Sequence, residues 1–130
     1  MPQTGVIFAL VHDNKILMQQ RDENCKKFPL MWCIPGGGTE EGEDYETTLL
    51  REIKEEYNLY VKLSDCTYCM DQDSEDGHSR VYVCKVHHNQ TPVLQEGLAM
   101  KWMSLEEIQG MQLGFHQEEI VKTLQSIFKQ

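Results

Sequence analysis

Short apolar runs separated by polar turns dominate the first third of this chain. Residues 5–11 are apolar and rich in β-branched and aromatic side chains, and a second run covers residues 15–20. An Asp-Asn pair between them is typical of a turn, so the two runs predict a β-hairpin. A polar loop should follow over residues 21–29. Residues 31–34 then predict a short strand that stops at a Pro-Gly-Gly-Gly sequence.

The middle of the chain changes to a helical period. Leu49, Leu50, Ile53 and Tyr57 recur every three or four residues and form one apolar stripe. Asp44 suits the N-cap position, because its side chain can accept a hydrogen bond from the first helical turn. We therefore expect a helix that begins after Asp44, docks on a sheet through this stripe and turns its other face toward a cleft.

The second half of the chain predicts further strands and two helices. The expected strands are Tyr60–Met70, Arg80–His87 and Leu98–Met103, with a polar turn over residues 71–77. Ser104 and Glu107 have the spacing of a capping box, which predicts a short helix. Residues 116–128 have the period of a terminal amphipathic helix. Strands on both sides of a central helix predict an α+β sandwich, and 130 residues suit one domain covering 1–130.

Three carboxylates share one face of the expected central helix. Glu52, Glu55 and Glu56 lie at positions i, i+3 and i+4, so they fall within an arc of about 100° with Cβ atoms ~5–6 Å apart. Like charges this close repel unless a cation neutralises them, and oxygen ligands suit a hard divalent ion such as Mg²⁺ or Mn²⁺. We expect a glycine-rich loop just before the helix, where a phosphate can approach the backbone closely. Together these features indicate phosphoanhydride chemistry.

The same stretch resembles the signature of the Nudix hydrolases, G-x5-E-x7-R-E-U-x-E-E-x-G-U, in which U is a bulky aliphatic residue. The matching positions are Gly37, Glu43, Arg51, Glu52, Ile53, Glu55, Glu56 and Leu59. The late glycine of the signature is Asn58 here. Asparagine tolerates the left-handed conformation that ends a helix, so we expect the chemistry to be intact.

The resemblance implies a Nudix-like α/β/α sandwich with a mixed sheet between helices. It also implies a Mg²⁺-dependent hydrolase, with Mn²⁺ as a substitute, that cleaves a diphosphate linkage in a nucleoside di- or triphosphate or a related nucleotide. The implied metal ligands are the Gly36 carbonyl, Glu52, Glu55 and Glu56. Glu52 is the implied general base, although coupled carboxylates leave the choice among them open.

Other positions match less specific parts of the family. Glu43 and Arg51 fall where an ion pair fixes the loop to the helix in Nudix hydrolases; the alternative is an ordinary surface salt bridge. Outside the signature the chain is similar to the MutT-like nucleoside triphosphate pyrophosphohydrolases, in order but with few identities. That similarity implies that Glu96 joins the metal network, that Arg21 contacts the phosphate or base, and that Gln117 lies near the amide that reads the base. The alternative for Glu96 is an ordinary loop carboxylate.

Substrate contacts complete the expected site. Gly37 and Gly38 should lie against the phosphates, since glycine backbone allows close approach. Phe28, beside a proline in a polar loop, is the favoured aromatic residue for stacking a base. Trp32, Trp102 and Phe115 are further candidates, and for the two tryptophans a core position is favoured. His116 could serve as a base, but a histidine at a helix start is more often structural.

Composition narrows the partners. The formal net charge is −9, and eight of the 21 acidic residues lie between Glu40 and Glu56, so a basic footprint for duplex nucleic acid is missing. No apolar run is long enough to span a membrane, and the N-terminus does not read as a signal peptide, which leads us to expect a cytoplasmic protein. Five cysteines in a reducing compartment argue against a disulfide framework. Cys66 and Cys69 on a strand should point to opposite faces, which favours ordinary thiols over a zinc site.

Three functions compete on these observations. The first is a metal-dependent hydrolase of nucleoside polyphosphates. Dinucleoside polyphosphates and nucleotide sugars are alternative substrates, and the sequence decides neither among them nor the oligomeric state. The second is a catalytically silent Nudix-like domain that binds a nucleotide as a sensor or scaffold; the full set of metal carboxylates favours catalysis. The third, an acidic helix without a metal role, is disfavoured by the fixed spacing.

Overall fold

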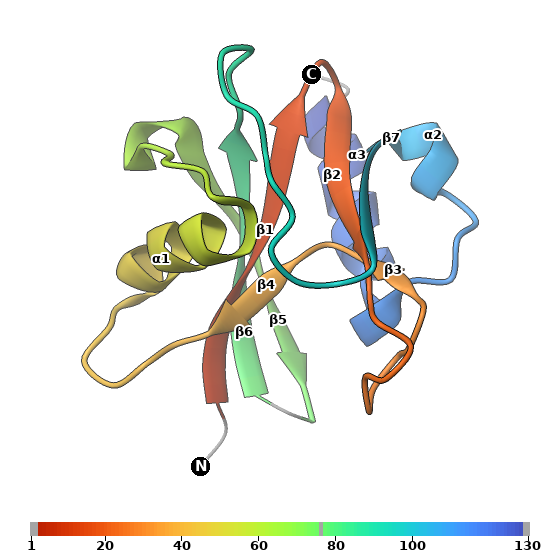
Figure 1. The fold of residues 1–130 in the computed structure, drawn as a ribbon, viewed down its shortest axis with the longest axis horizontal. Coiled ribbons are helices and arrows are strands. Elements are labelled where there is room, and N and C mark those ends of the chain that lie inside the picture. Colours follow the sequence, from red (N-terminus) through yellow and green to blue (C-terminus); the bar gives the residue numbers. More distant parts are fainter. Residues whose placement is uncertain (1–2, 76, 129–130) are drawn as a thin grey trace.

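A mixed β-sheet runs through the centre of the protein in the computed structural model, which describes residues 3–75 and 77–128 (Figure 1). The strands are β1 (Gln3–His12), β2 (Lys15–Gln20), β3 (Trp32–Cys33), β4 (Gly36–Gly38), β5 (Cys66–Ser74), β6 (Gly77–Lys85) and β7 (Ala99–Ser104). The helices are α1 (Tyr45–Tyr57), α2 (Leu105–Ile108) and α3 (Glu118–Phe128), with 3₁₀ turns at Leu63–Asp65 and Gly114–His116.

The strands pair in the order β3-β2-β1-β6-β5, with β4 joined to β1 and β7 joined to β2. β1 and β6 are parallel, and the other pairs are antiparallel. The predicted hairpin is confirmed: Asp13 and Asn14 form its turn with φ angles of 49° and 60°, which these two residue types tolerate better than most.

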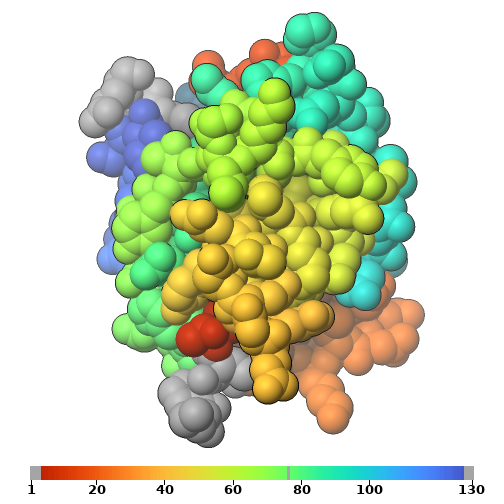
Figure 2. All heavy atoms as spheres, turned by 90° about the vertical axis from the view of Figure 1, so that its left-hand side faces the viewer, coloured from red at the N-terminus to blue at the C-terminus, as the bar shows by residue number. Residues whose placement is uncertain are grey.

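Helices cover both faces of the sheet. β1 alternates its side chains between them: Phe8 packs with Ile53 of α1, whereas Ile7 packs with Ile120 and Leu124 of α3. Figure 1 shows α1 and α3 on opposite sides of the sheet, and Figure 2 shows α1 with the segment before it across the middle of one face. The expected α/β/α arrangement with a mixed sheet is confirmed.

Both ends of α1 are fixed as the sequence predicts. The Asp44 carboxylate accepts a hydrogen bond from the Thr47 backbone N–H at 2.8 Å. At the other end Asn58 is left-handed, with φ 54° and ψ 39°, and its N–H donates to the Lys54 carbonyl at 2.8 Å. The substitution of asparagine for glycine at this position therefore leaves the helix end intact.

The glycine-rich segment differs from the expected loop. Gly36–Gly38 form a short strand, β4, antiparallel to β1. A Cβ atom added at Gly36 would overlap the carbonyl of Val6, and one at Gly5 would lie 2.6 Å from the Gly37 carbonyl oxygen. Glycines on both sides let these backbones lie closer than side chains permit, so the strand replaces the loop.

Several element boundaries also differ from the prediction. β5 begins at Cys66 rather than Tyr60 and continues to Ser74, and β6 already begins at Gly77, so strands occupy most of the polar stretch predicted as a turn over residues 71–77. β5 lies at the edge of the sheet, where a strand tolerates polar side chains. The polar residues of this stretch therefore predicted a turn where the structure has a strand. The terminal helix begins at Glu118, because Phe115 and His116 have positive φ angles.

Two smaller expectations concern cysteines and membranes. Cys66 packs with the cluster on the α1 side of the sheet, and Cys69 packs with the cluster on the α3 side, as strand geometry requires. Among the described helices, none is long and apolar enough to cross a membrane.

Candidate active site

Arg51 ties the glycine-rich segment to α1. Its guanidinium donates to both carboxylate oxygens of Glu43, from Nε at 2.7 Å and from Nη2 at 2.8 Å, and Nη2 also donates to the Gly38 carbonyl at 2.9 Å. The Thr48 hydroxyl donates to Glu43 at 3.0 Å. These bonds, chiefly those from Arg51, hold the pKa of Glu43 at about 2. A bidentate, largely buried pair of this kind fits the predicted supporting role better than a surface salt bridge.

Glu52 lies directly under the glycine strand. It is 7% exposed, and its carboxylate accepts from Arg51 Nη1 at 2.9 Å. A Cβ atom at Gly37 would overlap this carboxylate, so glycine is needed there for the strand and the carboxylate to meet. Burial raises the pKa of Glu52 above its ordinary value, which leaves the carboxylate ready to bind a proton or a cation.

Glu56 and Glu96 face the same cleft from α1 and from the loop before β7. Burial raises the pKa of Glu56 to about 7, with further contributions from the charges of Glu96, Glu52 and Glu55. Glu55 differs from the others, because its side chain is 55% exposed and accepts from Arg51 Nη1 at 3.2 Å. Glu96 is exposed as well. The structure therefore separates Glu55 and Glu96 from the more enclosed Glu52 and Glu56.

The donor set fits a hard divalent cation. The carboxylates concentrate negative charge near the backbone carbonyl groups of β4. Mg²⁺ and Mn²⁺ prefer oxygen ligands of both kinds. Within residues 3–75 and 77–128, no three acidic, histidine or cysteine side chains are already arranged to bind a metal. Arg51 Nη1 instead bridges Glu52 and Glu55. Metal binding would therefore require these carboxylate rotamers to change.

An open cleft of about 820 Å³ begins beside Glu56 and Glu96. Its lining includes the predicted Gly36–Gly38, Arg21, Phe28 and Gln117, and it does not include Glu43, Arg51, Glu52 or Glu55. The volume falls in the range of ~300–1,000 Å³ typical of small-molecule sites. The sequence-predicted residues thus divide into a cleft-lining group and a group beside or behind the glycine strand.

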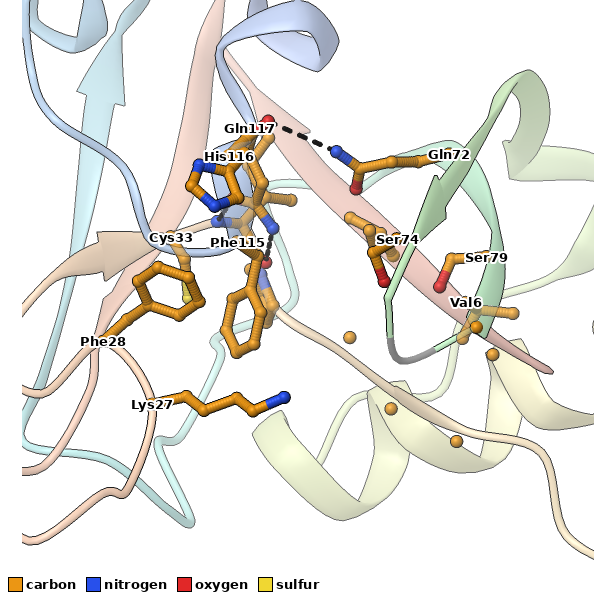
Figure 3. A pocket seen from close by; sticks show the side chains of 18 of the residues that line it. Val6, Lys27, Phe28, Cys33, Gln72, Ser74, Ser79, Phe115, His116 and Gln117 are labelled. Atoms are coloured by element: carbon orange, nitrogen blue, oxygen red, sulfur yellow. Dashed lines mark hydrogen bonds between the residues drawn. The ribbon is translucent and has the colours of Figure 1, made fainter. Parts of the chain in front are cut away.

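Aromatic rings close the far corner of the cleft (Figure 3). The Phe28 and Phe115 ring centroids are 4.9 Å apart at an interplanar angle of 57°, and His116 meets Phe28 edge-on at 5.5 Å. Arg21 lies over Phe115, with its guanidinium carbon 4.7 Å from the ring centroid, and donates to the Lys27 carbonyl at 3.0 Å. These contacts fix the rings by stacking and by a cation–π interaction.

The backbone of this corner is strained. Phe28, Leu30, Phe115 and His116 all have positive φ angles, between 51° and 63°. Bulky residues rarely adopt this conformation, and such strain tends to gather at ligand sites. Two chain segments far apart in sequence therefore hold the corner in a shape that their local preferences oppose.

Gln117 lines the cleft, and its amide is bonded to the backbone of Ile34. It is 1% exposed, its Oε1 accepts from the Ile34 N–H at 2.6 Å, and its Nε2 donates to the Ile34 carbonyl at 2.9 Å. The amide thus substitutes for a neighbouring strand beside β3. An amide engaged in this way is poorly placed to read a base, so its first task is to hold the wall of the cleft.

Several cleft residues had no clear signal in the sequence. Lys27 extends along the lower edge of the cleft, and Gln72 donates to the His116 carbonyl at 3.3 Å from across it (Figure 3). Gln19 lies between Glu56 and Glu96 in the lining. The Lys-Lys-Phe sequence in a polar loop was a usable hint for Lys27. The two glutamines could not be distinguished from ordinary polar strand residues.

This combination of a mixed sheet, a capped acidic helix and a glycine strand over the buried carboxylate of Glu52 defines a class of protein. The NUDIX domain family model matches residues 1–124. The chain belongs to this family.

Curated relatives and solved structures agree with this assignment. The chain is 38% identical over 68 residues to the nucleoside triphosphatase NudI of Salmonella arizonae. The matched residues cover 52% of this chain and 48% of that protein. It is 42% identical over 53 residues to an RNA pyrophosphohydrolase of Pelagibacter ubique, covering 41% of this chain and 32% of that protein. The chain therefore spans half or less of these relatives. A structure from work on MutT of Aliivibrio salmonicida and Vibrio cholerae superposes with a TM-score of 0.78 at 19% identity, over 96% of this chain and 99% of that one.

Proposed function

We propose that this chain is a divalent-metal-dependent hydrolase that cleaves a phosphoanhydride bond in a nucleoside di- or triphosphate. One observation carries the proposal: the carboxylates of Glu56 and Glu96 and a backbone glycine strand line the same cleft as two aromatic rings. The carboxylates and the glycine strand suit a metal-bound polyphosphate, and the rings suit a nucleobase. The names of the curated relatives, a nucleoside triphosphatase and an RNA pyrophosphohydrolase, support the same class of reaction.

Mg²⁺ is the expected metal, with Mn²⁺ as a substitute. Glu52, Glu56 and Glu96 would hold it together with the Gly36 carbonyl, and Glu55 would complete the set from the exposed side of α1. A bound metal neutralises phosphate charge and lowers the pKa of a coordinated water. Several carboxylates around one cleft offer ligands for more than one ion.

The remaining tasks fall to the protein's own groups. Arg51 and Glu43 fix the distance between the glycine strand and α1. The carboxylates of α1 therefore keep a fixed position relative to the glycine backbone that would contact the phosphate. Gly37 and Gly38 let a phosphate approach the main chain without a side chain in between. Phe28 and Phe115 would stack the base, because aromatic rings bind any base through its π-face.

Proton transfer would fall to one of the enclosed carboxylates. A general base works best when its pKa lies near the working pH, and burial raises the pKa of both Glu52 and Glu56. Glu52 is the base that the family resemblance implies. The two groups are coupled through their charges, so a pH profile would report the pair rather than either residue alone.

A screen of product release tests the proposal. Purified protein would be incubated with a panel of nucleoside di- and triphosphates, dinucleoside polyphosphates and nucleotide sugars, each with Mg²⁺, with Mn²⁺ and with excess chelator. We expect metal-dependent release of phosphate or pyrophosphate from at least one nucleoside polyphosphate. Nucleotide binding without turnover on the whole panel would instead support a silent, nucleotide-binding domain.

The end of an RNA chain is a second candidate substrate. The open cleft and the relative named RNA pyrophosphohydrolase favour it, whereas the net charge of −9 opposes binding of a long phosphate backbone. A 5′-triphosphorylated oligonucleotide in the panel separates the two. Turnover of the oligonucleotide at least as fast as that of the mononucleotides would favour RNA.

A further inference from the structure

The loop that bears Glu96 is bonded to both sides of the candidate metal site. On one side the Gln95 N–H donates to the Glu56 carbonyl at 3.0 Å, and on the other the Leu98 N–H donates to the Gln20 carbonyl at 2.9 Å. The first bond joins the loop to α1, and the second joins it to β2. Glu96 lies between these two anchors, but neither bond involves its own peptide group.

Gln19 supplies the missing bond. Its Nε2 donates to the Glu96 carbonyl at 3.2 Å, while its Oε1 accepts from the Tyr57 hydroxyl at 2.6 Å. Tyr57 is 0% exposed and follows Glu56 directly on α1. The side chain of Gln19 therefore connects α1 to the loop that bears Glu96 through two hydrogen bonds, one at each end of its amide group.

Gly97 shows how closely the loop is fitted to Gln19. Its φ angle is 94°, and a Cβ atom there would lie 2.6 Å from Gln19 Nε2 and 3.0 Å from the Gln20 carbonyl oxygen. A side chain at this position would push the loop away from β2. The glycine thus permits the bond between Gln19 and Glu96.

We propose that Gln19, oriented by Tyr57, is a positioning residue that sets the distance of Glu96 from the carboxylates of α1. The proposal rests on the proposed function, since it requires Glu96 to bind the metal. The Glu96 carbonyl can only accept, so the NH₂ group of Gln19 must face it, and the Gln19 oxygen then accepts from the Tyr57 hydroxyl, which holds the amide in this orientation. An apolar side chain at position 19 would remove this bond, and the segment around Glu96 would then be held only by the backbone bonds of Gln95 and Leu98 on either side.

The test measures Mn²⁺ affinity of the chelator-treated protein by electron paramagnetic resonance. Gln19→Met keeps the length and packing of the side chain but removes both hydrogen bonds. We expect it to weaken Mn²⁺ binding about 3- to 10-fold, the range of one side-chain hydrogen bond. Tyr57→Phe should weaken binding in the same direction but less. Gln95→Ala is the matched control, because among the described residues its side-chain amide bonds only to Val93 of the same loop, and it should change the affinity less than about twofold.

A double-mutant cycle separates positioning from a general structural effect. If Gln19 acts through Glu96, then Gln19→Met should have almost no further effect on Mn²⁺ affinity in a Glu96→Gln background. The proposal would be overturned if Gln19→Met weakened Mn²⁺ binding by the same factor in the wild-type and the Glu96→Gln protein. Wild-type Mn²⁺ affinity in Gln19→Met would also overturn it. A wild-type protein that binds no Mn²⁺ would overturn the proposed function and, with it, this inference. Steady-state kinetics add a second readout: kcat should fall in Gln19→Met while KM stays within about twofold.

Discussion

Glu56→Gln should make the metal-free protein more stable. The substitution keeps the size and the helix propensity of the side chain. It removes a negative charge that is disfavoured first by burial and then by repulsion from Glu96, Glu52 and Glu55. Most substitutions at partly buried positions destabilise a protein. A stabilising effect here would therefore be a specific sign of a carboxylate kept for function.

The magnitude follows from the pKa. Burial and the neighbouring charges raise the pKa of Glu56 from 4.5 to about 7. One pKa unit corresponds to about 1.4 kcal/mol. The full shift would give about 3 kcal/mol, and because Glu56 is only partly buried, screening by solvent reduces this to about 1–2 kcal/mol. For a domain of this size, about 1 kcal/mol shifts the melting temperature by about 4 °C. We expect a rise of about 4–8 °C at a pH above 7.

The sign of the pH dependence is fixed by linkage. A carboxylate whose pKa is raised on folding binds its proton more tightly in the folded state. Its contribution therefore lowers the free energy of unfolding as the pH rises from about 4.5 to about 7. The variant lacks this contribution. The difference in melting temperature between Glu56→Gln and wild type should be small near pH 5 and largest near pH 8.

Thermal melts in chelator across this pH range, followed by circular dichroism, provide the measurement. Glu55→Gln is the matched control, because its side chain is 55% exposed and its removal should change stability by less than about 0.5 kcal/mol. Adding Mg²⁺ should reverse the order, since a bound metal stabilises wild type more than the variant. The reasoning would be refuted if the difference in melting temperature between Glu56→Gln and wild type were the same at pH 5 and pH 8. It would also be refuted if Glu55→Gln showed the same difference.

Three other predictions concern catalysis and the walls of the cleft. Glu96→Gln should lower kcat at least ~10-fold without changing the melting temperature appreciably; steady-state assays that find less than a twofold change would remove Glu96 from the site. Phe28→Ala and Phe115→Ala should each raise KM roughly 5- to 150-fold and spare most of kcat, and an unchanged KM in both would place base recognition elsewhere. Gln117→Leu should lower the free energy of unfolding by about 2–4 kcal/mol in a urea titration, because both polar groups of Ile34 lose their partner; a change in base ranking without loss of stability would restore the role expected from the sequence.

Local rules placed the central helix and its ends correctly. Asp44 and Asn58 act through bonds to backbone groups three or four residues away, so their effect could be seen in the sequence. The acidic stripe follows from helical spacing in the same way. The extra strand Gly36–Gly38 could not be predicted by these rules, because it depends on close pairing with β1, a contact made in three dimensions.

The recognition end of the cleft was the least predictable part. Phe28 and Phe115 meet only because two loops, separated by more than half of the chain, adopt positive φ angles that their sequences do not favour. Gln117 lies in the cleft wall, but the bonds of its amide to Ile34 depend on tertiary packing and could not be read from the sequence. Sequence spacing therefore located the candidate metal end of the site, whereas tertiary contacts decide its substrate end.

Direct location of the metal tests the central claim most sharply. Crystals grown with Mn²⁺ and a slowly hydrolysed nucleoside triphosphate analogue would be measured at the manganese absorption edge. The account predicts an anomalous difference peak about 2.0–2.4 Å from carboxylate oxygens of Glu52, Glu56 or Glu96. The phosphates should lie along Gly36–Gly38 and the base beside Phe28 and Phe115. A nucleotide bound in the cleft without a manganese peak at these carboxylates would contradict it.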